Sequence, residues 1–378
     1  MVKKKILITF GTRPEAIKLA PLIIKLKQHK NFLVKVCITS QHKKMLKQVL
    51  NLFKIKYEYD LKIMKDNQTL GHVTSKILNK FDLVLNKFKP DLVIVHGDTT
   101  TTMASSISAY YKKIDVAHVE AGLRTENIYS PFPEEINRKI TSNICKFNFA
   151  PTNLSKKNLI NENIKKKNIL VTGNTVVDSL LLIKKIIKEN KKIQNKLVKK
   201  FGYFLSKEKK IILVTGHRRE NFGKGFRNIC MALLQIIKKH QDVLIIYPVH
   251  LNPNVKKPVK KILKNNPRII LLDPLNYVEF VFLMSKSYLI LTDSGGIQEE
   301  APTFNKPVLI MRNHTERPEA VKAGSAKLVG TNQSKIYKEV SKILLNRNSL
   351  KKIQKIKNPF GNGNASLKIV KYLNKKLF

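Results

Sequence analysis

The sequence predicts an α/β protein built from two doubly wound domains, each with a parallel sheet. Short apolar runs rich in β-branched residues alternate with amphipathic helical stretches along the chain, a pattern typical of parallel sheets covered by helices. The length of 378 residues allows two sizeable cores. The alternation pauses in the lysine-rich stretch 191–210. We expect an N-terminal domain over 1–172, a C-terminal domain over 173–360, and a final helix over 361–378.

In the first domain, strands are expected at 5–10, 33–39, 92–95, 116–119, 147–150 and 169–172. Helices are expected from Pro14 to about Lys27 and at 41–52, 68–88, 103–111 and 153–161. Pro90 should stop the helix before the central strand. In the second domain, the helix 176–189 and the lysine-rich stretch lead into strands at 211–215, 243–248, 269–272, 289–292 and 307–311, with a helix at 277–284.

Acidic residues follow the two central strands of the first domain. Asp98 and Glu120 each come after an apolar run. The carboxyl ends of parallel strands meet at one edge of a sheet, so these side chains should lie side by side. Glu134 and Glu135 follow in the loop SPFPEE. Crowded carboxylates have shifted pKa values and suit general acid–base chemistry. The alternative is that Asp98 and Glu120 only cap the helices after them.

Three other turns predict anion sites. Gly11, Thr12 and Arg13 precede the first helix, so Arg13 is a candidate phosphate ligand, with Lys18 on the same helix. Arg13 as a surface charge at a helix cap is the alternative. Their sequence is not a GxGxxG dinucleotide fingerprint.

The second and third turns lie in the C-terminal domain. His217 lies in a glycine-flanked basic turn after 211–215, where an imidazole could neutralise a leaving phosphate or move a proton; the alternative is a histidine that caps a helix. Ser294, Gly295 and Gly296 form a small-residue turn whose N–H groups can face a ligand. Glu300 follows this turn, and its carboxylate could accept hydrogen bonds from both hydroxyls of a ribose. The alternative is that it only interacts favourably with the helix dipole.

The composition excludes several classes of protein. The net charge of +46 suggests nucleic-acid binding, but only ten of the 72 basic residues are arginine, and the 62 lysines are spread along helix faces. Three scattered cysteines indicate a reducing compartment, hence the cytoplasm, and no metal site. No run is apolar enough for a membrane span, and no signal peptide is expected. These observations favour a cytoplasmic enzyme that binds neither nucleic acid nor membrane.

Nine motifs occur in order along nearly the whole chain: FGTRPEAIKLAPLI, VHGDTTTTMA, HVEAGLRT, SPFPEEINR, TGNTVVDSL, GHRRENFG, PVHLNPNV, TDSGGIQEEAP and TERPEAV. The series resembles that of the non-hydrolysing UDP-N-acetylglucosamine 2-epimerases. The resemblance implies a GT-B-type fold, in which two Rossmann-like domains face a cleft and the C-terminal helix crosses back to the first domain. It also implies a homodimer, no added cofactor, and a product, UDP-N-acetylmannosamine, that feeds cell-surface polysaccharide synthesis.

The resemblance also implies residue roles. The proton on the second sugar carbon is removed as UDP leaves, giving a 2-acetamidoglucal. Reprotonation of that carbon on the other face and return of UDP to the anomeric carbon complete the inversion. Asp98, Glu120 and Glu134 would handle the protons, with base and acid not apportioned among them. His217 and Arg13 would face the pyrophosphate. The remaining implied ligands are Ser294, Gly295 and Gly296 for phosphate, Glu300 for ribose, Phe280 and the backbone of Leu275 for uracil, and Lys18 and Arg317.

Bacterial members of the family are often activated by their own substrate at a second site, and Gln41, His42 and His250 lie in the matching stretches. Two other enzymes remain open from sequence: a hydrolysing epimerase that releases N-acetylmannosamine and UDP, and a GT-B glycosyltransferase. The chain carries no fused kinase domain, which favours the non-hydrolysing kind. A glycosyltransferase would need an acceptor site and has less use for three clustered carboxylates.

Overall fold

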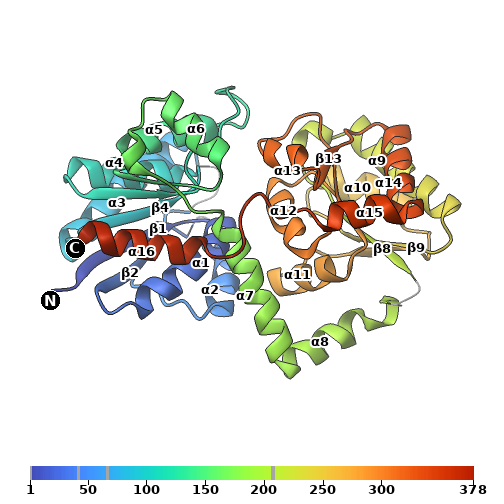
Figure 1. Cartoon of the computed structure of the whole chain (residues 1–378), viewed down its shortest axis with the longest axis horizontal. Helices are drawn as coiled ribbons and strands as arrows, with labels where there is room; N and C mark the ends of the chain where they lie inside the picture. Colours follow the sequence, from blue (N-terminus) through green and yellow to red (C-terminus); the bar gives the residue numbers. More distant parts are fainter. Residues whose placement is uncertain (1, 41–42, 65–67, 206–208) are drawn as a thin grey trace. The chain divides into compact units, whose positions relative to one another are not determined.

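The computed structural model describes residues 2–40, 43–64, 68–205 and 209–378 (Figure 1). The chain forms two compact units. The first contains Met1–Ser179 and Phe360–Phe378, and the second contains Leu180–Pro359. The first unit therefore continues past the boundary expected at residue 172, to the first third of helix α7 (Thr175–Glu189), and the chain returns to it at Phe360.

The first unit is a seven-stranded parallel sheet in the order β3-β2-β1-β4-β5-β6-β7. Its strands are β1 (Lys4–Phe10), β2 (Phe32–Ile38), β3 (Tyr59–Asp60), β4 (Leu92–His96), β5 (Asp115–Val119), β6 (Phe147–Ala150) and β7 (Ile169–Val171). Every residue of β4 is buried, as expected for a central strand covered on both faces. The edge strand β3 was not expected, because two residues carry no periodic signal.

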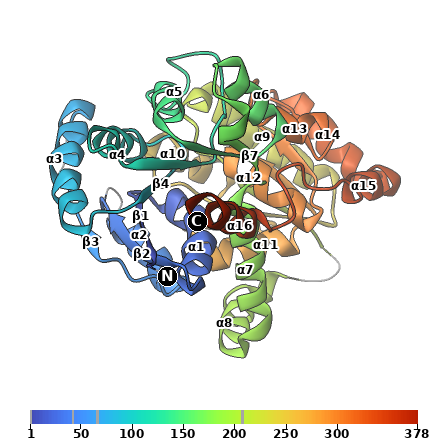
Figure 2. The same ribbon diagram turned by 60° about the vertical axis from the view of Figure 1, so that its left-hand side comes forward.

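Helices cover both faces of this sheet. They are α1 (Arg13–Gln28), α2 (Lys43–Leu52), α3 (Leu70–Phe88), α4 (Thr100–Tyr111), α5 (Glu134–Ile144), α6 (Asn153–Asn161) and α16 (Ala365–Leu377), with a short 3-10 helix at Lys166–Asn168. The C-terminal α16 packs beside α1 (Figures 1 and 2). On the other face, Phe81 and Ile77 of α3 pack in one core cluster with Val93 and Val95 of β4. This packing fixes the strands whose carboxyl ends carry the acidic residues.

The second unit is a six-stranded parallel sheet in the order β10-β9-β8-β11-β12-β13. Its strands are β8 (Lys210–Thr215), β9 (Val243–Pro248), β10 (Ile269–Leu272), β11 (Leu289–Thr292), β12 (Val308–Ile310) and β13 (Ala326–Leu328). Phe226, Leu233 and Ile236 of α9 pack with Ile212, Ile245 and Leu291 of three neighbouring strands in one cluster. In both sheets every strand pairing is parallel, which confirms the expected fold class.

The helices of this unit are α8 (Lys191–Phe201), α9 (Lys224–Lys239), α10 (Pro253–Leu263), α11 (Tyr277–Lys286), α12 (Gly295–Glu300), α13 (Pro318–Lys322), α14 (Gln333–Leu345) and α15 (Arg347–Gln354), with 3-10 helices at Gly202–Phe204, Arg219–Asn221 and Ala301–Phe304. The lysine-rich stretch was expected as a polar domain junction, and it contains helix α8, whose Leu197 and Phe201 are buried. Lysine is a good helix former, and two apolar residues four positions apart give this short helix a buried face.

Candidate active site

Glu120 is the most constrained acidic residue of the first unit. It follows β5 in a left-handed conformation, with φ of 66°, and its side chain is buried. Its Oε2 accepts hydrogen bonds from Nζ of Lys18 and, at 2.7 Å, from Nδ2 of Asn174. A non-glycine residue at such a φ costs about 1–3 kcal/mol and persists only where its surroundings hold it. No helix begins directly after Glu120, so it is not a helix cap.

Asp98 lies at the same edge, after β4, with its side chain 26% exposed. Nε and Nη2 of Arg138 both donate to its Oδ2, at 3.0 and 2.5 Å. The N-cap of α4 is Thr99, whose hydroxyl oxygen accepts from the backbone N–H of Thr102. The capping interpretation is therefore wrong for Asp98 as well, and the carboxylate is held by an arginine and open to solvent.

Glu134 and Glu135 begin α5 and differ in their environment. Glu135 is fully buried and accepts from Nη1 of Arg138 and from the backbone N–H groups of Thr125 and Glu126. Glu134, the expected proton carrier, is half-buried at the first helical position. Glu135 thus has a structural task, since it ties the loop 125–126 to α5, whereas Glu134 is the partner with access to solvent.

Helix α1 brings a further buried carboxylate that the sequence analysis did not single out. Oε2 of Glu15 accepts from the backbone N–H groups of Gly11 and Thr12 and from the Thr12 hydroxyl, and Oε1 accepts from the Thr99 hydroxyl at 2.8 Å. Burial raises the pKa of Glu15, opposed by these hydrogen bonds. Arg13, at the first position of α1, is half-buried. Thr12 and Glu15, three positions apart, form a capping box at the start of α1, and this spacing can be recognised in the sequence.

His96 is the second residue that sequence reasoning missed. It ends β4, it is 3% exposed, and its Nε2 lies 4.0 Å from Oε2 of Glu120. Neither ring nitrogen has a hydrogen-bond partner among the residues that the structure describes. Burial lowers the pKa of His96 to about 4, with Glu120 opposing the shift. Burial likewise lowers the pKa of His118 to about 4, against its hydrogen bond to the carbonyl of Gly97. Two neutral imidazoles therefore lie beneath the carboxylates.

In the second unit, His217 and Asp293 meet at the carboxyl ends of β8 and β11. Nδ1 of His217 lies 3.2 Å from Oδ1 of Asp293; the imidazole is 42% exposed and the carboxylate is fully buried. The ring of His250 stacks on His217 with centroids 5.7 Å apart. His217 is outside the nearby 3-10 helix Arg219–Asn221, so it does not cap it. An exposed imidazole backed by a buried anion is a donor for an anionic ligand.

The small-residue turn lies next to this pair. Ser294 is the N-cap of α12, and Gly295 and Gly296 are its first residues. A Cβ on Gly295 would lie 3.1 Å from Cζ of Arg317, whereas a Cβ on Gly296 would meet nothing within 4 Å. Nε of Arg317 donates to Oε1 of the fully buried Glu299 at 2.8 Å. Gly295 thus makes room for an arginine, and Gly296 leaves open space above the turn.

Glu300 is buried at the end of α12 and accepts from the Tyr277 hydroxyl at 2.7 Å. The expected uracil ligands Leu275 and Phe280 are half-buried, before and within α11. The hydrogen bond from the tyrosine orients the carboxylate of Glu300. Gln41 and His42 lie outside the described residues. His250 is exposed and its Nδ1 accepts from the backbone N–H of Asn252.

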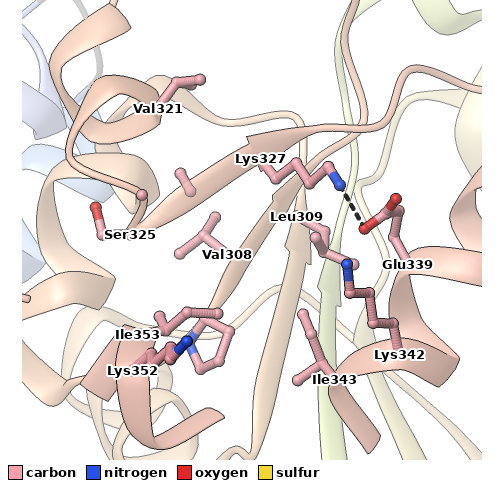
Figure 3. Close-up of a pocket in the computed structure, with 13 residues that line it drawn as sticks. Val308, Leu309, Val321, Ser325, Lys327, Glu339, Lys342, Ile343, Lys352 and Ile353 are labelled. Carbon is pink, nitrogen blue, oxygen red and sulfur yellow. Dashed lines mark ion pairs between the residues drawn. The ribbon is translucent and has the colours of Figure 1, made fainter. Parts of the chain in front are cut away.

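A separate pocket of about 400 Å³ lies in the second unit between β12, β13, α14 and α15 (Figure 3). It is lined by Val308, Leu309, Ile343 and Ile353, with an ion pair of 2.7 Å between Lys327 and Glu339. None of the predicted site residues lines it. Among the described residues, no cluster of histidine, cysteine and acidic side chains could hold a metal ion, and no helix there combines the length and apolar character needed to span a bilayer.

Two parallel α/β sheets, one with acidic and one with glycine-rich carboxyl ends, define a GT-B-type nucleotide-sugar epimerase fold. The family model described as UDP-N-acetylglucosamine 2-epimerase matches residues 24–374. The UDP-N-acetylglucosamine 2-epimerases of Campylobacter jejuni and Escherichia coli K12 are 52% identical over 374 residues and 51% identical over 369 residues, and each match covers 98% of both chains. The chain belongs to the UDP-N-acetylglucosamine 2-epimerase family, which confirms the expected resemblance.

Solved structures agree. The enzyme from Neisseria meningitidis, in a crystal structure bound to UDP-GlcNAc, is 50% identical, with a TM-score of 0.93 over 98% of this chain and 100% of that one. The enzyme from Methanocaldococcus jannaschii, in complex with UDP-GlcNAc and UDP, is 38% identical, with a TM-score of 0.82 over 98% and 99% of the two chains.

Proposed function

We propose that this chain catalyses the reversible epimerisation of UDP-N-acetylglucosamine to UDP-N-acetylmannosamine without net hydrolysis. Family membership over nearly the full length supports the reaction. The observation that carries the mechanism is Glu120, a buried carboxylate held in a strained backbone conformation by Lys18 and Asn174. Such over-determined acidic groups are typical of catalytic positions.

The chemistry divides into two balanced halves. A carboxylate takes the proton from the second sugar carbon while the anomeric C–O bond breaks, and the electron pair of the C–H bond forms the double bond of 2-acetamidoglucal. UDP leaves with the electrons of the C–O bond. A second carboxyl then protonates the opposite face as UDP adds back. Asp98, Glu120 and Glu134 are the proton carriers in this proposal, and the net reaction consumes nothing.

The groups of the second unit serve UDP in the same proposal. Donors of Ser294, Gly295 and Gly296 would hold the phosphates, because this turn combines outward N–H groups with open space at Gly296. Glu300, already oriented by Tyr277, would accept from the ribose, and Phe280 and Leu275 would hold the uracil. Arg317 of the second unit would supply positive charge, as would Arg13 and Lys18 of α1 in the first unit. His217 would donate to the departing phosphate.

We also infer a cytoplasmic homodimer whose product enters cell-surface polysaccharide synthesis. The three cysteines are buried and free, as expected in a reducing compartment. Leu83 of α3 and Tyr110 and Tyr111 of α4 are 61–74% exposed apolar side chains on two adjacent helices. Such an apolar face favours association with a second copy. Substrate activation through Gln41, His42 and His250 stays a prediction.

Proton NMR of the full chain with UDP-N-acetylglucosamine in deuterated water tests the function. We expect UDP-N-acetylmannosamine with deuterium at the second sugar carbon and little free UDP. Free UDP with free N-acetylmannosamine would instead indicate the hydrolysing reaction. The Asp98→Asn variant should lose at least about 100-fold in kcat, because general acid–base groups contribute about 10²–10⁴. Epimerisation by this variant at the wild-type rate would refute the catalytic assignment of Asp98.

A further inference from the structure

Asp293 is fully buried at the end of β11 and has a dense set of donors. The sheet register pairs Thr292 of β11 with Thr215 of β8, so Asp293 falls beside the turn that carries His217. Its Oδ2 accepts from the backbone N–H groups of His217 and Arg218, both at 2.9 Å, and from Nδ2 of Asn221 at 3.2 Å. Three donors fix this oxygen and therefore the plane of the carboxylate.

The other oxygen has a different environment. Oδ1 of Asp293 makes no hydrogen bond of good geometry with the described residues, and Nδ1 of His217 lies 3.2 Å from it. A buried carboxylate oxygen without a donor is costly, so this nitrogen must carry a proton. Burial raises the pKa of Asp293. The hydrogen bond and charge of His217, together with the backbone donors, lower this pKa by more than burial raises it, so the net shift is downward.

We propose that Asp293 is a positioning residue for His217, which holds the ring proton on Nδ1 and leaves Nε2 for the phosphate of UDP. The inference rests on the proposed function and adds to it how the histidine is oriented. The imidazole is 42% exposed, so its second nitrogen can reach a ligand. A protonated Nε2 donates to the phosphate oxygen that gains charge as the C–O bond breaks, and the buried carboxylate balances the imidazolium.

Two other groups face this pair. The ring of His250 stacks on His217, and the pKa of His250 is lowered by burial and by the charge of His217, against the attraction of Asp293. The hydroxyl of Tyr247 is buried and has no hydrogen-bond partner in the described part of the chain. Burial raises the pKa of Tyr247, with Asp293 adding to the shift. Tyr247 is therefore neutral, and Asp293 is the anion that can hold the His217 proton.

The Asp293→Asn variant should invert the tautomer of His217. Three N–H donors occupy the position of Oδ2, so the amide oxygen of asparagine must lie there. The NH₂ group then takes the position of Oδ1 and points at Nδ1 of His217. A donor facing Nδ1 makes this nitrogen an acceptor, which moves the proton of the neutral ring to Nε2 and disfavours the imidazolium.

Long-range ¹H–¹⁵N NMR of the full chain labelled with ¹⁵N-histidine measures the tautomer directly, with His217 assigned from the spectrum of His217→Gln. In the wild type we expect the neutral ring to carry its proton on Nδ1, and in Asp293→Asn on Nε2. The kcat of the variant should fall about 100-fold, while KM changes about threefold or less. Asp242→Asn is the matched control: this carboxylate, with a side chain 47% exposed, lies at the amino end of β9 and pairs with Lys210. It should leave the tautomer of His217, kcat and KM unchanged.

A wild-type His217 protonated on Nε2 would overturn the proposal, and so would a variant that keeps the wild-type tautomer or the wild-type kcat. The wild-type spectrum alone shows which nitrogen of His217 carries the proton, so it tests the proposal even if Asp293→Asn does not fold. Because the tautomer is read without any turnover, the spectrum also separates this inference from the proposed function: an inactive protein with an Nδ1-protonated His217 would refute the reaction and support the role of Asp293.

Discussion

The two sheets place their functional groups at the same end but arrange them in opposite ways. At the carboxyl edge of the first sheet, largely buried cations lie against the acids: the side chain of Lys18, against Glu120, is 10% exposed, and that of Arg138, against Asp98, is 4% exposed. At the edge of the second sheet, the acid is fully buried and its histidine partner is 42% exposed, as in Asp293 beneath His217. The first arrangement suits proton transfer and the second suits binding of an anion.

Histidine shows the same contrast. His96 and His118 of the first unit are buried, with their pKa values lowered to about 4, so they are neutral and leave the negative charge to the carboxylates. His217 of the second unit is 42% exposed, and its Nδ1 lies 3.2 Å from the buried carboxylate of Asp293. A position at the end of a strand therefore does not by itself decide whether an imidazole is buried and neutral or exposed to a ligand.

The largest effect is expected from Glu120→Gln. A neutral amide cannot take a proton, so kcat should fall by about 10³. The buried Lys18 also loses its counter-charge, which should lower the free energy of unfolding by about 3 kcal/mol. NMR turnover and urea unfolding measure the two effects. Glu126→Gln, an exposed carboxylate in the following loop, is the control. A kcat within tenfold of wild type would remove Glu120 from the chemistry.

His96→Gln tests the neutral histidines through stability against pH. The pKa of His96 is about 4 in the folded chain and about 6.5 when unfolded. Between these values the unfolded chain binds more protons, so stability should fall as pH falls from 6.5 to 4, by about 2–3 kcal/mol from this residue. Glu15, with its raised pKa, acts in the opposite direction above 4.5.

The variant should therefore lose less stability than wild type between pH 7 and pH 5 in urea unfolding. The exposed His72 of α3 offers the matched substitution His72→Gln, which should leave the pH dependence unchanged. Equal slopes for wild type and His96→Gln would show that His96 can be protonated in place, which would break the contrast between the two edges.

Two glycine variants test whether the turn at the edge of the second sheet binds an anion. Gly295→Ala places a methyl group 3.1 Å from Cζ of Arg317, and such overpacking should lower the free energy of unfolding by about 1–3 kcal/mol. Gly296→Ala meets nothing within 4 Å and should raise stability by up to about 1 kcal/mol. Its UDP affinity should nevertheless fall by about tenfold, a loss of roughly 1.4 kcal/mol, because the methyl group occupies the space proposed for phosphate.

Isothermal titration with UDP and urea unfolding together separate the two outcomes. A loss of affinity without a loss of stability at Gly296 is the signature of a ligand contact. Wild-type UDP affinity in Gly296→Ala would mean that the turn serves packing only, as it does at Gly295, and the phosphate would have to bind elsewhere.

The sequence predicts the strands and their end residues well, because buried parallel strands leave a periodic apolar signal with turn residues behind it. Asp98, Glu120, His217 and the turn at Gly295 all follow from position alone. Their partners do not. Arg138 reaches Asp98 across 40 positions and Asn174 reaches Glu120 across 54, and such separations carry no local pattern.

Buried polar residues inside motifs were missed for a related reason. His96 and Asp293 each stand next to the residues that attracted attention, yet whether such a side chain is exposed or buried depends on packing from distant helices. The bounds of helix α8 were not predicted because its lysines dominate the composition and only Leu197 and Phe201 of this helix are buried. Glu15 was predictable in part, since it stands three positions after the capping residue Thr12.

The smallest effect is expected at the pocket in Figure 3, where Lys327→Ala breaks the ion pair with Glu339. This pair has the same residue types as Lys18 and Glu120, but its lysine side chain is 53% exposed, compared with 10% for Lys18. Water screens the exposed pair, so its loss should cost about 0.5 kcal/mol or less and leave kcat unchanged. Urea unfolding and NMR turnover check both. A fall in kcat would show that this pocket takes part in the reaction, and the functional groups would then not be confined to the carboxyl edges of the two sheets.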